Sequence, residues 1–195
     1  MAEIKKGKRM KRLIQKKIKK TKENLYYILS ALMIGLIVGG IDALFGRVLI
    51  AITDFRGRYI QILIWFLPIA GLFICWMYHR FNEMSLKGMT LVLETAQGKR
   101  ADIPLALVPL VMVGTWITHL FGGSAGREGV AVQIGATLSH WFARRFKFAD
   151  NRTILLIAGM AAGFGGLFQT PFAAVFFAME VVVTGKMLYQ AFLPS

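Results

Sequence analysis

Two charged residues, Arg127 and Glu128, stand between glycines in the stretch GSAGREGVAVQIG, residues 123–135. A short apolar segment beginning at Val130 follows them, and its pattern predicts a helix. The start of a helix carries unpaired N–H groups and the positive end of the helix dipole, so it can hold an anion or a carboxylate. If an external anion displaces the carboxylate, the more exposed carboxyl can take a proton. Glu128 is therefore a candidate for coupling anion movement to proton movement.

The glycines beside this pair, Gly126 and Gly129, allow the backbone to approach an ion closely. A purely structural alternative is that Arg127 and Glu128 form an ion pair or cap a helix in an ordinary loop. The residue types alone leave the anion site and the structural loop open. We interpret Arg127 as a cation that holds the loop or tunes its field, and His119 as a residue that gives protons access to the loop.

The composition predicts an all-α, polytopic membrane protein. The chain has 195 residues, of which 56% are hydrophobic and 17% are charged, and a water-soluble domain is rarely so apolar. The net charge of +14 belongs mostly to residues 1–24, where eleven lysines and arginines precede the first apolar run. Apolar residues at helical spacing there favour a basic amphipathic segment on the cytoplasmic membrane surface, with a nucleic-acid-binding arm as the weaker alternative.

The apolar segments divide into two long ones and a series of short ones. Residues 25–52 and 59–78 are each long enough to span a bilayer, and the basic residues before them place the N-terminus in the cytoplasm. The short segments cover residues 89–93, 103–121, 130–142, 154–167 and 171–183. Interrupted helices at membrane depth occur where protein or a watery cavity covers their ends, as in transporters and channels. The alternative is a set of ordinary spans whose limits are poorly marked.

Two sequence blocks resemble the CLC family of chloride channels and anion/proton antiporters. GREGVAVQIG, residues 126–135, resembles the family's GREGP motif and the xVQxG that follows it. AGMAAGFGGLFQTPFAAVFFAME, residues 158–180, resembles the family pattern GAAAGxxxxFxxPxxGxxFxxE. The resemblance implies that Glu128 is the external gate and the proton-transfer group. It also implies that residues 25–195 form the first of two inverted repeats, with short broken helices.

Three departures from the common pattern resemble the fluoride/proton antiporter branch of this family. Met89, in LKGMTLVLE, stands where most members have the serine of GSGIP, and Val130 replaces the proline of GREGP. Val181 occupies the position of a second, internal proton-pathway glutamate. The resemblance implies that the anion is held by Gly88, Met89, Gly126, Arg127, Gly129 and Val130.

The expected function is proton-coupled fluoride export across the cell membrane. A chloride channel or chloride/proton exchanger is one alternative, and a truncated membrane fragment that transports nothing is another. An enzyme is not expected, because no nucleophile–base or metal constellation accompanies Glu128. The expected partners are fluoride or chloride, protons, membrane lipid, and a missing second repeat or partner half. A homodimer is possible, whereas nucleic acid, a metal ion and a cofactor are not expected.

Overall fold

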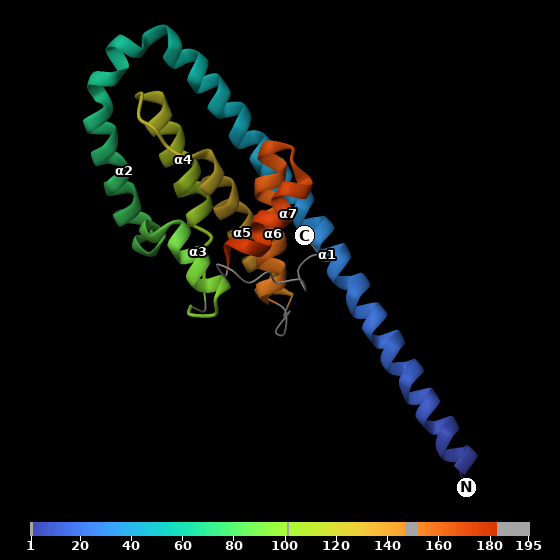
Figure 1. The fold of residues 1–195 in the computed structure, drawn as a ribbon. Coiled ribbons are helices and arrows are strands. Elements are labelled where there is room, and N and C mark those ends of the chain that lie inside the picture. The colour runs from blue at the N-terminus through green and yellow to red at the C-terminus, as the bar shows by residue number, and fades with distance from the viewer. Residues whose placement is uncertain (1, 101, 147–151, 183–195) are drawn as a thin grey trace.

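Helices account for all the regular structure in the described part of the chain. The computed structural model describes residues 2–100, 102–146 and 152–182, and the side chains from residue 25 onward. The helices are α1 (Ala2–Leu63), α2 (Leu67–Phe81), α3 (Met89–Ala96), α4 (Leu107–Leu120), α5 (Arg127–Arg145), α6 (Arg152–Phe168) and α7 (Pro171–Val181), with 3-10 turns η1 (Ile64–Phe66) and η2 (Glu83–Lys87). The early part of α1 projects from the other helices (Figure 1). The predicted all-α class is confirmed.

The connection between the two predicted spans, residues 25–52 and 59–78, lies later in the chain than the sequence predicted. The sequence predicts a break between residues 52 and 59, but α1 continues to Leu63. Its only residue with non-helical angles is Tyr59 (φ −125°, ψ 15°), and η1 completes the turn. Residues 53–58 contain no proline, so nothing there removes a backbone donor. Pro68 instead stands in the first turn of α2, where its missing N–H costs nothing.

The stretch from α1 to α2 presents much of its apolar surface outward. Residues 25–81 are long and apolar enough to cross a membrane, by length and composition. Large side chains on this stretch are well exposed, including Leu36, Trp65 and Leu72. α2 returns from the turn, and α4 packs against both α1 and α2 (Figure 1). Such exposed apolar surface suits contact with lipid or with other protein rather than with water.

The closest helix pair, α5 and α6, meets through small residues. A β-carbon added to Gly159 would overlap the carbonyl oxygen of Gly135 and the side chain of Ser139. A β-carbon on Gly163 would overlap the carbonyl oxygen of Ala131 in the same way. Gly159 and Gly163 form a GxxxG motif, and close helix packing is what this motif predicts. The structure shows this close contact between α5 and α6, which fixes the position of α5.

The short helix α3 is held by a buried apolar cluster. Its Leu91 and Val92 are fully buried, and they pack with Ile157 and Met160 of α6. Met179 of α7 belongs to the same cluster. A helix of eight residues is marginal in isolation, so its stability must come from this packing.

Candidate functional site

The glutamate identified from the sequence lies inside the first turn of α5. Gly126 is the N-cap residue, with φ −69° and ψ 131°, and no side chain caps the helix. Arg127 and Glu128 are the first two helical residues. The helix thus begins three residues earlier than the predicted start at Val130. The macrodipole and the unpaired N–H groups of α5 therefore act directly at Glu128.

The earlier start changes which N–H groups can face an anion. In a helix that begins at Arg127, the free donors are those of the N-cap residue and the first three helical residues. Gly126, Arg127 and Gly129 keep this role as candidates. Val130 is the fourth helical residue, whose N–H bonds to the N-cap carbonyl in a regular helix. Its side chain is buried in the same apolar cluster as Phe45, so Val130 lies at the site without offering a free N–H donor.

Arg127 and Glu128 are both exposed, and they do not pair with each other. Neither side chain has a hydrogen bond or ion pair within the described residues. The alternative in which Arg127 and Glu128 form an ion pair in a loop is therefore wrong. The carboxylate of Glu128 is thus exposed and unpaired in the first turn of the helix.

The start of α3 presents the second group of sequence-predicted residues. Gly88 is the N-cap residue and has φ +49° and ψ −122°, a conformation that favours glycine. Its N–H donates to the carbonyl oxygen of Ser85 at 3.0 Å, so this donor is not available to an anion. Met89 is the first helical residue of α3 and is half-buried against the apolar cluster that contains Leu91 and Met160. The main-chain N–H at Met89 is therefore a better candidate donor than that of Gly88.

A residue that the site prediction missed, Gln133, lies between these two helix starts. A β-carbon on Gly88 would lie 3.5 Å from Gln133 Oε1, and one on Gly129 would lie 3.8 Å from Nε2. The structure thus brings Gly88 and Gly129 to the same amide. The signal in the sequence was one polar residue within an otherwise apolar and small-residue run, residues 129–136. Such a signal does not reveal which helix faces that residue.

A polar cavity of about 450 Å³ lies beside the start of α5. Its lining includes His119 from the end of α4, Arg127, and Asp54 and Arg56 from α1. Arg56 donates a hydrogen bond to the carbonyl oxygen of His119 at 3.3 Å. His119 Nδ1 lies 3.0 Å from the carbonyl oxygen of Thr115, which can only accept, so Nδ1 carries the hydrogen in the neutral ring. Nε2 then carries the free lone pair of the ring.

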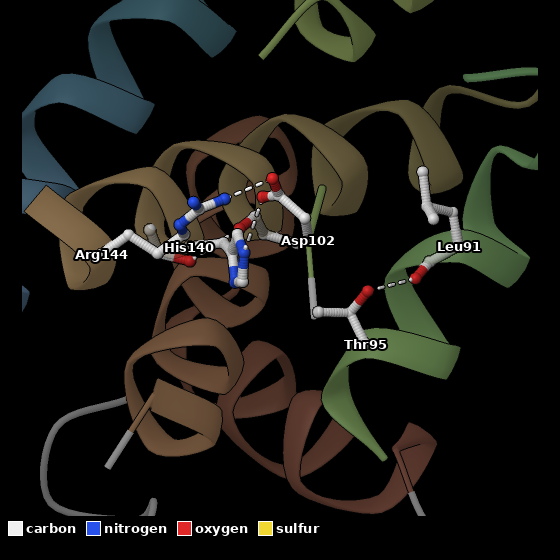
Figure 2. Close-up of polar contacts among 7 residues, drawn as sticks. Leu91, Thr95, Asp102, His140 and Arg144 are labelled. Atoms are coloured by element: carbon white, nitrogen blue, oxygen red, sulfur yellow. Dashed lines mark hydrogen bonds and ion pairs between the residues drawn. The ribbon is translucent and has the colours of Figure 1, made fainter. Parts of the chain in front are cut away.

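A second polar cluster lies at the opposite end of α5 (Figure 2). Asp102 accepts a hydrogen bond from His140 Nε2 at 3.3 Å and forms an ion pair with Arg144. Burial by itself would raise the pKa of Asp102. The hydrogen bonds and positive charges of Arg144 and His140 outweigh this effect, so the pKa of Asp102 lies below its usual value. No role was predicted for Asp102 from the sequence. The cluster ties the segment before α4 to α5.

Removing the Asp102 carboxylate should destabilise the protein more than removing Arg144. Asp102→Ala leaves the N–H of a histidine that is 3% exposed without a partner, which costs about 1–3 kcal/mol. Arg144→Ala breaks only a half-exposed ion pair that solvent screens, so its effect should be smaller. Apparent melting temperatures of the purified proteins in detergent measure the two effects.

The pH dependence of the same measurement follows from the lowered pKa of Asp102. A carboxyl whose folded-state pKa is lowered stabilises the fold above its unfolded pKa, near 3.9, and loses this contribution as the pH falls through the folded-state value. The difference between the wild type and Asp102→Ala should therefore shrink in that acidic range. Equal melting temperatures for Asp102→Ala and Arg144→Ala at neutral pH would contradict the role of the His140 hydrogen bond.

Comparison with known proteins identifies relatives among anion transporters. The profile of the family described as "Voltage gated chloride channel" matches residues 70–195. A "Chloride/fluoride channel protein" from Pseudomonas syringae pv. tomato is 36% identical over 163 residues, which are 83% of this chain and 36% of that protein. An H(+)/Cl(−) exchange transporter from Citrobacter koseri is 27% identical over 185 residues, which are 86% of this chain and 38% of that protein.

The fold has a close match among solved structures. The crystal structure of a CLC-type fluoride/proton antiporter is 47% identical and superposes with a TM-score of 0.85, covering 87% of this chain and 43% of that one. The chain thus spans less than half the length of these relatives. The family profile covers well over half of the chain. The motif of residues 126–135 lies at the start of α5, and that of residues 158–180 lies on α6 and α7. The chain belongs to the voltage-gated chloride channel family, whose relatives lie in membranes.

Proposed function

We propose that the chain carries part of the ion pathway of a proton-coupled fluoride exporter, with Glu128 as its gate. The observation that carries the proposal is the exposed, unpaired carboxylate in the first turn of α5. The fluoride/proton antiporter at 47% identity supports fluoride as the anion. Two of the three departures from the common motif, Met89 and Val130, lie at the candidate site and support the same choice.

The proposed cycle uses one side chain for both ions. Ionised Glu128 lies against the N–H groups at the start of α5 and closes the path to other anions. An arriving fluoride competes for the same donors, and the displaced carboxylate turns toward solvent and takes one proton. The neutral carboxyl no longer competes, so the fluoride can pass. His119 beside the cavity is positioned to deliver that proton from the outer side, and return of Glu128 to the helix start releases it toward the cytoplasm.

We propose a multi-pass placement in the cell membrane with the N-terminus in the cytoplasm. The eleven basic residues within residues 1–24 support this orientation, because positive charge is retained on the cytoplasmic side. Glu128 then faces outward, and the Asp102–His140–Arg144 cluster faces the cytoplasm. The whole transporter would require a second repeat or partner half beside the described helices, and a homodimer of such units is compatible with this arrangement.

Anion efflux from liposomes tests the proposed selectivity. The protein made from the complete reading frame should release fluoride at least about tenfold faster than chloride, a preference of about 1.4 kcal/mol. Met89→Ser restores the serine that most family members have at this position, so chloride efflux should rise relative to fluoride efflux. Ion-selective electrodes measure both rates. Faster chloride than fluoride efflux from the wild type would favour a chloride channel or exchanger, and no efflux of either ion would favour a fragment without transport activity.

A further inference from the structure

The candidate pathway lacks one side-chain donor that its ligand would need. Met89 offers a thioether, which is at best a weak acceptor and donates no hydrogen bond. A small anion such as fluoride loses strong hydration when it enters a protein, and charge-assisted hydrogen bonds must replace that hydration. The Gly88 N–H is already bonded to Ser85. A further donor close to the start of α3 would therefore matter for the proposed transport.

Gln133 is the polar side chain that meets both helix starts. Its residue is 8% exposed, so it is more than nine-tenths buried. Its amide lies next to Gly88 at the start of α3, and it also reaches back to Gly129 in the first turn of its own helix, α5. The α3 helix has eight residues and α5 has nineteen, so each begins with unpaired N–H groups at the positive end of a helix dipole. The amide is thus directed at the junction of two helix dipoles.

The amide of Gln133 has no partner in the described structure. Oε1 is buried without a hydrogen bond, and no hydrogen bond to Nε2 occurs among the described residues. A buried, unsatisfied amide oxygen is unfavourable and requires an explanation. The hydroxyl groups of Ser85 and Thr137 bond elsewhere: Ser85 Oγ donates to Asn82 Oδ1, and Thr137 Oγ1 donates to the carbonyl oxygen of Gln133. A half-turn of the terminal amide exchanges its oxygen and nitrogen, so the N–H donors can face either helix start.

We propose that Gln133 is a ligand of the transported anion and donates a hydrogen bond from Nε2 to a dehydrated halide held between the starts of α3 and α5. This role rests on the proposed transport function. Gln133 then supplies the side-chain donor that Met89 lacks. A carboxamide is neutral, so it binds the anion without the strong trapping that a lysine or arginine would cause, and the ion can still leave.

Fluoride efflux from liposomes containing Gln133→Met tests the proposal. Methionine has a similar length and no N–H donor, so fluoride efflux should fall by about tenfold to a hundredfold, the effect of losing one hydrogen bond to a charged group. Thr137→Val is the matched control. Thr137 is also buried, one turn further along α5, but its hydroxyl bonds to the main chain, so fluoride efflux should stay near the wild-type rate.

Gln133→Glu provides a second test if the methionine variant fails to fold. A carboxylate of nearly the same shape repels the anion at neutral pH, and its protonation restores an O–H donor. Fluoride efflux should be low at neutral pH and should rise more steeply than wild-type efflux as the pH falls. Wild-type rates in both Gln133 variants would overturn the ligand role alone. A wild-type protein that carries neither fluoride nor chloride would overturn the proposed function, and the ligand role with it.

Discussion

Replacing Glu128 by glutamine is expected to abolish proton coupling while leaving some anion flux. The amide cannot gain or lose a proton at working pH, so it cannot carry one through the cycle. It also has no negative charge to compete with fluoride for the N–H groups at the start of α5, so fluoride can still pass. Parallel records of fluoride efflux and proton uptake in liposomes measure the two fluxes. The ratio of protons to fluoride should fall to the level of protein-free liposomes.

The control for this experiment is Glu83→Gln, which removes an exposed glutamate far from α5 in sequence. Glu83 lies in η2, and its carboxylate contacts His79 Nδ1 at 3.1 Å. An exposed pair of this kind has little energetic value, so proton and fluoride fluxes should match the wild type. Proton-coupled fluoride flux at the wild-type rate in Glu128→Gln would disprove the gate assignment. Loss of all flux in both variants would indicate damage to the fold instead.

Replacing Gly159 by leucine is expected to prevent folding. The glycine lies against the backbone of Gly135 and the side chain of Ser139, where even a β-carbon has no room. Backbone atoms cannot move aside as a flexible side chain can, so α5 and α6 would have to separate. Overpacking of a core costs about 1–3 kcal/mol, and a contact between two backbones should exceed that range. Size-exclusion chromatography and circular dichroism of the purified protein measure the loss.

The same substitution at Gly71 serves as the matched comparison. Gly71 is a helical glycine in α2, and a β-carbon there would have no neighbour within 4 Å. Gly71→Leu should therefore fold, and the better helix propensity of leucine should add a few tenths of a kcal/mol to about 1 kcal/mol of stability. If Gly159→Leu were as stable as Gly71→Leu, the close packing of α5 and α6 could not be what positions Glu128.

Local sequence signals predicted the features that depend on neighbouring residues. The apolar run after Glu128 predicted a helix from Val130, and the structure has this helix, α5, beginning three residues earlier at Arg127. The spacing of Gly159 and Gly163 predicted a close helix contact, because small residues four apart lie on one helix face. Proline marked the beginning of α7 at Pro171, since its missing N–H is tolerated in a first turn.

The predictions that were wrong concern the ends of helices, because no single residue determined where those helices end. The turn after the first long helix lies near Tyr59 rather than before it, because residues 53–58 are compatible with a helix and packing decides where the chain reverses. The last short segment was predicted to run to residue 183, whereas α7 ends at Val181 and residue 183 lies outside the described part. The predicted amphipathic character of residues 1–24 likewise falls on side chains outside the described set.

By itself, the sequence determined a helical membrane protein with a carboxylate at a helix start, because composition and periodicity are properties of consecutive residues. Only the tertiary structure decided which helix ends meet. Gly88 and Gln133 are 45 positions apart, so their contact depends on how α3 packs against α5. Asp102 meets His140 and Arg144 for the same reason. Contacts between distant segments follow from the burial of whole helix faces, and no local pattern encodes that burial.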